Sequence, residues 1–296
     1  MTYYVAIDIG GMSIKHGILT QKGALVTSGA FVLSTQECGV EKLLKAVVSI
    51  VENYQRGYSL SGIALATAGV VDVASGKIIF GGQHFPGYSG TDWISYLGQR
   101  FNLPVTVEND VNALALGEYW QGAAQGKELV YVLAMGTGIG GALMHKGKLI
   151  HGASWSTGEV GCGHMGEKEN WEDVASTKAL VEQVAQAQGI SPKALKGEDI
   201  FAQALKGDEE CQAALDILIE RWAEGIANIC YIVNPQQIIL GGAVTVQEEY
   251  LKPLLLARLK QRLAPPLYAA TEITFSALEN RGILLGALYN FLEKQG

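Results

Sequence analysis

The chain has 296 residues, 48% of them hydrophobic and 17% charged, which excludes wholesale disorder and is typical of about two globular domains. Its formal net charge of −7 argues against a broad nucleic-acid surface but leaves room for a phosphate site built from backbone amides. Glycine is unusually frequent, at 37 residues, and the four cysteines have no paired spacing, which suits a reducing compartment.

The N-terminal segment has no basic stretch before an apolar run and meets Asp8 early, so we expect no signal peptide. The longest uncharged run, residues 225–247, contains asparagine, proline and paired glycines that would break a spanning helix. We therefore expect a cytoplasmic protein with neither a membrane nor a nucleic-acid partner.

The first half reads as three strands followed by alternating helices and strands. Helical spacing of apolar residues marks residues 41–54, and a nearly continuous apolar run marks residues 61–71 as a buried parallel strand. In chain order, we expect strands at 4–9, 13–19 and 24–33, a helix at 41–54, a strand at 61–71, a loop at 78–90, a helix at 91–101, a strand at 105–107 and a helix at 111–120.

A second series of strand, glycine-rich turn and strand begins at residue 130. Residues 22–30 (KGALVTSGA) and 146–154 (KGKLIHGAS) carry the same turn chemistry at the same place in each series. The pattern predicts two related halves rather than a solenoid. In chain order, we expect strands at 130–134, 142–144 and 148–151, helices after residue 173, strands at 237–240 and 272–275, and a last helix at 282–294.

The familiar nucleotide-binding motifs do not explain the glycine-rich segments. No Gly-x-x-x-x-Gly-Lys-Ser/Thr sequence occurs, and residues 136–141 match Gly-x-Gly-x-x-Gly but precede a hairpin pattern instead of a helix. Either turn alone is compatible with a tight hairpin. Two turns of small residues in equivalent places, at 10–13 and 136–141, predict backbone amides that bind a polyphosphate between two domains.

Five segments in series resemble the sugar kinases of the ROK family, and they span essentially the whole chain. They are DIGGMSIK (8–15), ENDVNALALGE (108–118), MGTGIGGAL (135–143), STGEVG (156–161) and ILGGAV (239–244). The resemblance implies an α/β fold of the actin/hexokinase-like type, with duplicated ribonuclease-H-like βββαβαβα domains around an interdomain cleft. It implies a smaller domain of residues 1–114 plus 282–296 and a larger domain of residues 115–281.

The resemblance gives Asp110 the role of catalytic base, which takes a proton from a sugar hydroxyl. Asp110 follows a predicted strand and begins a predicted helix, where a carboxylate can also serve only as a cap. The helix dipole should favour the ionised form that a base needs. The residues that we expect to contact the sugar are Asn109, Glu159, Gly69, Cys162 and His164.

The resemblance also implies an ATP site on the two glycine turns. We expect Asp8 to organise Mg²⁺, through water, because a carboxylate at the end of a buried strand is otherwise costly. Met12 stands where the family has threonine, so a hydroxyl contact is lost or taken over by Ser13. The expected ATP- and phosphate-binding residues are Asp8, Gly10, Gly11, Ser13 and Lys15 in the first turn, Thr137, Gly138 and Gly140 in the second, and Gly241 and Gly242 on the adenosine side.

The sequence departs from the family pattern after Glu159. Cys162 stands at a position where the family has histidine, His164 follows, and the cysteine-rich zinc loop is replaced by GEKENWEDVAS. A structural zinc site needs four ligands, so we expect no zinc and a small buried thiol at Cys162.

In the family, the missing histidine contacts the sugar near its anomeric carbon, so the resemblance implies that the smaller Cys162 opens space there. It thus favours a hexose or a β-glucoside such as cellobiose, phosphorylated on its 6-hydroxyl. The segment that begins at Trp171 resembles β-glucoside kinases. The alternatives are an N-acetylmannosamine kinase or a fructokinase; a free hexose or an N-acylhexosamine would follow if His164 fills the vacated place.

Two other classes of protein remain for comparison. A sugar-responsive regulator would carry a DNA-reading domain before the first phosphate turn, and seven residues precede Asp8, so we do not expect one. A sugar-binding protein without kinase activity would tolerate the loss of Asp110. The helix at 211–233 has more apolar residues than one buried face requires. The additional residues could be buried in the core or form a dimer contact, and we expect a homodimer.

Overall fold

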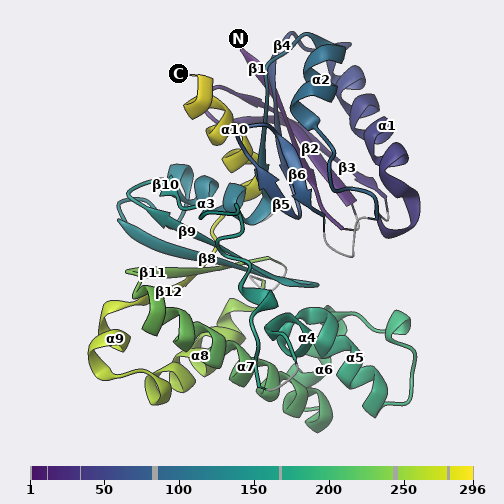
Figure 1. Ribbon diagram of the computed structural model, residues 1–296. Coiled ribbons are helices and arrows are strands. Elements are labelled where there is room, and N and C mark those ends of the chain that lie inside the picture. Colours follow the sequence, from purple (N-terminus) through teal and green to yellow (C-terminus); the bar gives the residue numbers. More distant parts are fainter. Residues whose placement is uncertain are drawn as a thin grey trace. The chain divides into compact units, whose positions relative to one another are not determined.

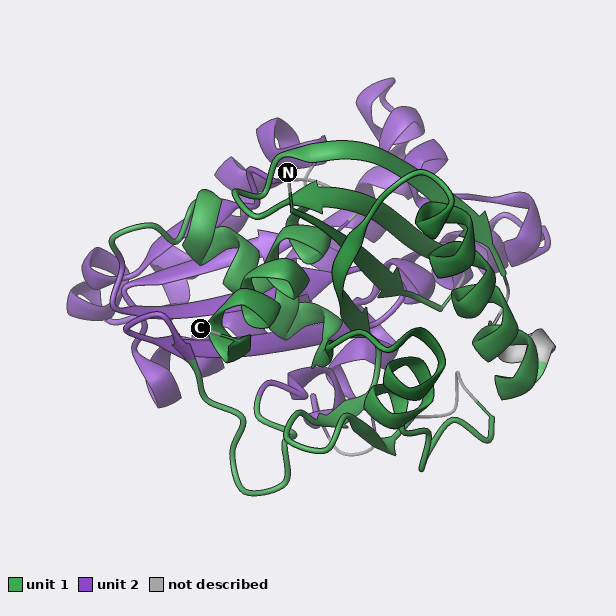
Figure 2. Cartoon of the chain, turned by 90° about the horizontal axis from the view of Figure 1, so that it is seen from above, with its two compact units in different colours: residues 1–126, 149–157, 280–296 green, residues 127–148, 158–279 purple. Residues whose placement is uncertain are grey.

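The computed structural model describes residues 2–11, 13–33, 35–81, 86–166, 169–242, 246–278 and 281–295. The chain forms two compact units, each assembled from separate stretches of sequence. Unit 1 contains residues 1–126, 149–157 and 280–296, and unit 2 contains residues 127–148 and 158–279 (Figure 2). The domain limits expected from the sequence, after residue 114 and before residue 282, remain a proposal.

Unit 1 is built on a five-stranded mixed sheet. Its strands are β1 (Tyr3–Ile9), β2 (Ser13–Thr20), β3 (Leu25–Val32), β4 (Leu60–Thr67) and β7 (Val105–Asn109). Their order across the sheet is β3-β2-β1-β4-β7; the first three pair antiparallel, whereas β4 and β7 run parallel to β1. β1 and β4 are central, which explains why both are almost continuous runs of buried residues.

The two faces of this sheet carry side chains of different size. Val5 and Ile7 of β1 point into an apolar core shared with residues of α1 (Thr35–Gln55) and α2 (Trp93–Phe101). On the other face, the ring of Phe291 occupies the space above Gly62, because α10 (Gly282–Gln295) packs there. Helices therefore cover both faces of the sheet (Figure 1).

Helix α10 also packs closely on α3 (Asp110–Gln121), with glycines at the crossing. A Cβ atom at Gly286 would collide with the carbonyl oxygen of Ala113, and one at Gly117 would collide with the carbonyl oxygen of Gly282. The two backbones can approach this closely only because both positions lack a side chain. The last helix thus fixes the helix that begins at Asp110.

Unit 2 repeats the sheet of unit 1. Its strands are β8 (Leu129–Met135), β9 (Ile139–His145), β10 (Lys148–Leu149), β11 (Gln237–Gly241) and β12 (Glu272–Phe275). Their order is β10-β9-β8-β11-β12, with β9 antiparallel and β11 parallel to β8. The first four strands therefore match the order and sense of β3-β2-β1-β4, with β12 parallel beside β11 as β7 is beside β4. The predicted duplication is confirmed.

The helices of unit 2 lie on one side of its sheet (Figure 1). They are α4 (Trp171–Ala175), α5 (Thr177–Ala187), α6 (Gly197–Leu205), α7 (Glu209–Val233), α8 (Glu248–Arg262) and α9 (Pro265–Ala270), with short 3-10 turns at Val160–Cys162 and Pro192–Ala194. Trp222 of α7 is fully buried, and its indole N–H donates to the carbonyl oxygen of Ala175 at 2.7 Å. This bond ties the long helix to α4.

Three predicted elements were wrong in detail. The run at 61–71 is two strands, β4 and β5 (Val70–Asp72), because Gly69 between them has a φ of 97°. The predicted loop at 78–90 begins with β6 (Lys77–Phe80), which pairs antiparallel with β5. Helix α1 begins before residue 41 and is interrupted at Gly39.

The uncharged run at 225–247 forms the end of α7, a left-handed turn at Asn234 with a φ of 50°, and then β11. Within the described ranges of the chain, none of the helices combines the length and apolarity that crossing a membrane requires.

Candidate active site

Three parallel strands of unit 1 end side by side, and the expected catalytic residues lie at this edge. In register, Ile9 pairs with Thr67, and Thr67 pairs with Asn109. Asp8 precedes the end of β1 by one residue, and Asp110 follows the end of β7. The carboxyl ends of adjacent parallel strands commonly form binding sites in α/β sheets.

Asn109 caps helix α3, which leaves Asp110 at the first helical position. The Asn109 Oδ1 atom accepts hydrogen bonds from the backbone N–H groups of Val111 and Asn112, at 2.9 and 3.0 Å. Its Nδ2 group donates to the carbonyl oxygen of Gly69 at 3.1 Å. Asn109 therefore fills the capping position, and the Asp110 Oδ1 atom also accepts from the Val111 N–H, at 2.9 Å.

Asp8 and Asp110 are close enough to influence each other's protonation. Burial, and secondly the charge of Asp110, raise the pKa of Asp8 to about 7, while Lys15 opposes the shift. Burial also raises the pKa of Asp110, against hydrogen bonds that favour its ionised form. Burial is thus the larger influence on the Asp110 carboxylate, and the hydrogen bonds oppose it.

Two neighbouring carboxylates whose pKa values are raised form a donor set that suits a hard divalent cation. Mg²⁺ prefers oxygen ligands and keeps part of its hydration. A cation beside Asp8 would offset the unfavourable charge there, since Lys15 is the only basic group among the causes of the Asp8 shift. The residues present therefore fit magnesium.

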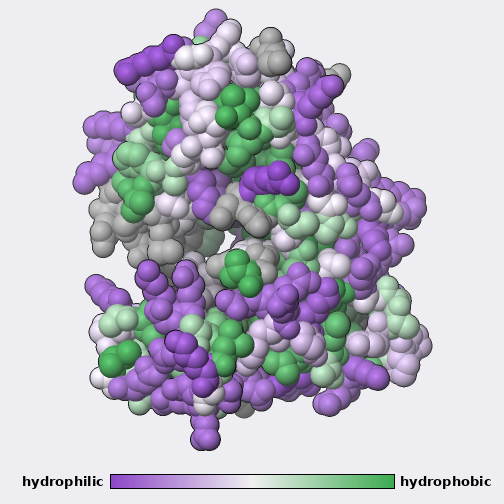
Figure 3. All heavy atoms as spheres, turned by 180° about the vertical axis from the view of Figure 1, so that it is seen from behind, coloured by the Kyte–Doolittle hydropathy of each residue, from purple (hydrophilic) through white to green (hydrophobic). Residues whose placement is uncertain are grey.

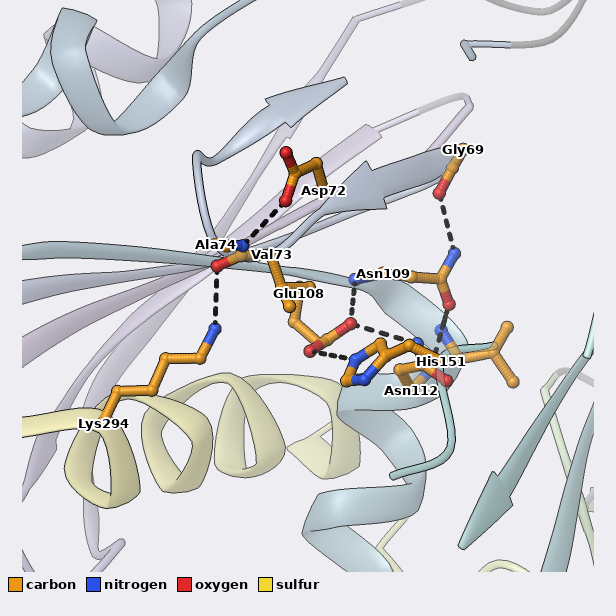
Figure 4. Close-up of polar contacts among 10 residues, drawn as sticks. Gly69, Asp72, Val73, Ala74, Glu108, Asn109, Asn112, His151 and Lys294 are labelled. Atoms are coloured by element: carbon orange, nitrogen blue, oxygen red, sulfur yellow. Dashed lines mark hydrogen bonds and ion pairs between the residues drawn. The ribbon is translucent and has the colours of Figure 1, made fainter. Parts of the chain in front are cut away.

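The buried carboxylate of Glu108 organises the residues around this edge, a role that the sequence analysis missed. Its side chain is 1% exposed. Its Oε1 atom accepts from the backbone N–H of Asn109 and from Asn112 Nδ2, both at 3.0 Å. Its Oε2 atom lies 3.0 Å from Nε2 of His151 (Figure 4). The sequence signal for this role was a charged residue within a buried strand, because a buried carboxylate needs hydrogen-bond partners.

A second polar link joins the same region to the C-terminal helix. Lys294 donates from Nζ to the carbonyl oxygen of Val73 at 3.1 Å (Figure 4). Burial lowers the pKa of Lys294, while the charges of Glu108 and Asp72 raise it. Helix α10 is thereby held at its end as well as at its glycine crossing.

A buried tyrosine forms a hydrogen bond with the last residue of β4. The Tyr88 hydroxyl lies 2.7 Å from the Thr67 hydroxyl and accepts from the Trp93 indole N–H at 2.8 Å. Burial raises the pKa of Tyr88, and the charge of Asp110 contributes to the rise. Tyr88 is therefore near the catalytic edge, and nothing in its sequence neighbourhood predicted this.

The first glycine turn connects β1 to β2. Gly10 donates its N–H to the carbonyl oxygen of Ser13 at 3.0 Å, and Gly11 is exposed. Lys15 pairs in register with Asp8 across the two strands. Met12, the expected departure from the family pattern, lies outside the described residues.

The second glycine turn connects β8 to β9 in unit 2. The Gly136 N–H donates to the carbonyl oxygen of Gly138 at 3.0 Å, and Thr137 lies at the tip. The Glu172 carboxylate lies against this turn, accepting from the Ile139 N–H at 3.4 Å. Glu172 was missed by the sequence analysis; it places an anion beside amides expected to bind phosphate.

The expected adenosine turn lies beside the second glycine turn. Gly242 has a φ of 93°, and a Cβ atom there would lie 2.6 Å from the carbonyl oxygen of Met135, the last residue of β8. Only glycine fits this contact. The structure therefore brings Gly241 and Gly242 next to the turn that contains Thr137, Gly138 and Gly140.

Glu159, Cys162 and His164 follow one another around a short 3-10 turn in unit 2. All three are exposed, so the expectation of a buried thiol at Cys162 was wrong. Partial burial of the sulfur raises the pKa of Cys162, and the carboxylates of Glu172 and Glu159 add to the rise.

Metal-ligating side chains do not gather around this turn. In the portion of the chain that the structure describes, no group of three or more His, Cys, Asp or Glu side chains could hold a metal ion. The absence of zinc stays a prediction.

The structure thus forms two groups of expected site residues, one in each unit. Unit 1 contains Asp8, Gly10, Gly11, Ser13, Lys15, Gly69, Asn109 and Asp110, and unit 2 contains Thr137, Gly138, Gly140, Glu159, Cys162, His164, Gly241 and Gly242.

A family model described as the ROK family matches residues 4–294. The chain belongs to the ROK family. This ROK protein is 32% identical over 295 residues to a β-glucoside kinase of Klebsiella pneumoniae, and the match covers 97% of this chain and 95% of the relative.

Two solved structures extend this comparison. A ROK family protein from Streptococcus pneumoniae in complex with sucrose is 28% identical, with a TM-score of 0.84 and 99% coverage of both chains. A ROK family glucokinase from Streptomyces griseus in complex with glucose and AMPPNP is 25% identical, with a TM-score of 0.84 and coverage of 99% of this chain and all of that one. The fold of this ROK protein is therefore the actin/hexokinase-like fold, as predicted.

Proposed function

We propose that this ROK protein transfers the γ-phosphoryl group of ATP to the 6-hydroxyl of a hexose or a β-glucoside, such as glucose or cellobiose. Its broader class, a carbohydrate kinase that is a phosphotransferase with an alcohol acceptor, follows from the family and from relatives named as β-glucoside kinase and glucokinase. The finer acceptor is supported by the β-glucoside kinase match and by the loss of the family histidine at Cys162.

The observation that carries the proposal is the separation of roles at the start of α3. Asn109 caps the helix, while Asp110 accepts from the Val111 N–H through Oδ1 and has a raised pKa, and we assign the base to its other carboxylate oxygen. A raised pKa brings a carboxylate closer to the working pH, which makes it a better proton acceptor. In the proposed step, Asp110 takes the proton of the attacking hydroxyl at its carboxylate, the hydroxyl oxygen bonds to the γ-phosphorus, and the bond from that phosphorus to the β,γ-bridging oxygen breaks as ADP leaves.

The glycine turns supply the anion-binding part of the proposal. Gly10 and Gly11 in unit 1 and Thr137 and Gly138 in unit 2 present backbone in turns of small residues, where phosphate oxygens can come close to N–H groups. Phosphoryl transfer asks a protein mainly for positioning and charge stabilisation. Asp8 would hold Mg²⁺, through water, and the ion when bound would neutralise phosphate charge.

We also propose the contacts to the sugar and to the adenosine, on the basis of the family resemblance. The acceptor hydroxyls would be bound by Asn109, Glu159, Gly69, Cys162 and His164. The adenosine would contact Gly241 and Gly242. Asn109 and Gly69 are linked by a hydrogen bond, so they would act as one surface.

A homodimer in the cytoplasm completes the proposal. Helix α7 exposes Ile217, Tyr231 and Ile232, the last with 84% of its surface accessible. On the face drawn in Figure 3, hydrophobic residues are interspersed with hydrophilic ones. Sedimentation velocity across a concentration series tests the dimer, and Ile232→Glu should weaken it.

An ADP-release assay with a panel of sugars tests the function. Glucose, cellobiose, N-acetylmannosamine and fructose are compared by kcat/KM, and the phosphorylated position is read by NMR. Turnover of glucose or cellobiose at the 6-hydroxyl supports the proposal. A preference for N-acetylmannosamine or fructose would favour the alternative kinases, and no turnover of any sugar, with binding retained, would indicate a regulatory or sugar-binding protein.

A further inference from the structure

Trp155 has a backbone conformation that a bulky residue rarely adopts. Its φ is 63°, in the left-handed region that favours glycine, and a bulky side chain there is a true outlier. The side chain is half-buried, so part of the indole remains accessible. Strain of this kind persists only where the surrounding structure imposes it.

The loop that carries Trp155 is closed on itself. The Thr157 N–H donates to the carbonyl oxygen of His151 at 3.2 Å, which joins the two ends of the loop. Within it, the Ser156 hydroxyl donates to the carbonyl oxygen of Ser154 at 3.1 Å. These bonds fix the backbone on both sides of Trp155, where the φ is strained.

The same loop is tied to the catalytic edge. The rings of Trp155 and His151 meet edge to face, with centroids 5.3 Å apart. The His151 Nε2 atom lies 3.0 Å from the buried carboxylate of Glu108, which directly precedes Asn109 and Asp110. One side chain, that of His151, therefore separates the indole from the strand end that carries the proposed base.

We propose that Trp155 determines acceptor specificity by binding the second ring of a two-ring acceptor such as cellobiose, an inference that rests on the proposed function above. The C–H faces of a sugar ring are apolar, and a fixed, half-exposed indole offers a flat apolar surface for them. The proposal places the second ring of an acceptor against this surface while the reacting hydroxyl of the first ring is at Asp110. A single-ring acceptor leaves the indole uncovered.

The test compares cellobiose with glucose in the Trp155→Gly and Trp155→Asn variants of the full chain. Glycine and asparagine both tolerate a positive φ, so neither change should prevent folding, and melting temperatures check this. We expect the ratio of kcat/KM for cellobiose to that for glucose to fall about tenfold, the size of a lost aromatic contact. Trp155→Phe should keep most of the ratio, and Trp120→Phe, a half-buried tryptophan elsewhere in unit 1, should leave it unchanged.

Each outcome of this comparison supports or overturns the inference. A fall in the ratio with both replacements supports it. Equal losses on both sugars, or no loss on either, overturn it while the proposed kinase function stands. Turnover of glucose without cellobiose by the native chain also overturns it. No turnover of any sugar by the native chain removes the proposed function, and the inference falls with it.

Discussion

Replacing Asp8 by asparagine should make the folded protein more stable at pH 8, although it should also abolish phosphoryl transfer. Asp8 is 5% exposed, and its pKa is raised from 3.8 to about 7, first by burial and then by the charge of Asp110. The folded state therefore holds the proton more tightly than the unfolded state. Stability is lost as pH rises from 3.8 to about 7, and the cost is complete above that range.

The size of the effect follows from the two pKa values. Each pKa unit corresponds to about 1.4 kcal/mol, so the raised pKa of Asp8 costs roughly 4 kcal/mol of stability at pH 8 and about 2 kcal/mol at pH 5, where only the unfolded chain is ionised. The amide that replaces the carboxylate carries no charge at either pH. We expect the variant to exceed the native chain by these amounts in free energy of unfolding, with a difference in melting temperature on the order of 8 °C at pH 8.

The assay is unfolding by urea and by heat, at pH 5 and pH 8, in EDTA so that no divalent cation contributes. Asp72→Asn is the matched control. Hydrogen bonding from Ser75 lowers the pKa of Asp72, so removal of this carboxylate should change the free energy of unfolding in the opposite direction. That variant should lose stability equally at pH 5 and pH 8, because the contribution of a carboxylate with a lowered pKa is lost only as pH falls below 3.8. An Asp8→Asn variant that gains equally at both pH values, or that is less stable at pH 8, would refute the reasoning.

Three further changes test other parts of the structure. Asp110→Asn should lower kcat by about a thousandfold with little change in sugar KM, measured by ADP release, and a change in KM alone would contradict a base. Glu172→Gln removes an anion from the second glycine turn and should lower the KM for ATP by about threefold in the same assay; a higher KM would contradict repulsion. Gly286→Ala forces apart the backbones of α3 and α10 and should cost about 3 kcal/mol in urea unfolding, whereas Gly57→Ala, with open space at Cβ, should cost little.

The sheet of each unit was predictable because its signals are local. Apolar runs and short glycine turns define the strands, and the repeated turn chemistry at 22–30 and 146–154 predicted the duplication that the strand orders confirm. The split at Gly69 was not predictable from apolarity, since Val70 and Val71 continue the apolar run and only the backbone angle ends the strand. The periodicity of side chains does not report a positive φ.

The candidate site was predictable to the extent that it follows strand ends. The resemblance gave Asp110 and Asp8 their roles, and both residues lie at or beside the end of a buried strand, as the sequence pattern predicted. Glu172 and His151 were not, because their roles depend on contacts between residues far apart in sequence. The raised pKa of Asp110 was not predictable either, because the helix end is visible in the sequence whereas burial is a property of the packed structure.

The glycine crossing of α3 and α10 has a consequence for synthesis of the chain. Unit 1 contains both residues 1–126 and residues 280–296, so its sheet lacks one helical layer until the last helix has left the ribosome. At roughly 5–20 residues per second, β1 waits roughly 15 to 55 s for that layer. During this time the face of the nascent sheet that contains Gly62 has no cover from α10, and a chaperone that binds apolar strands would find it there.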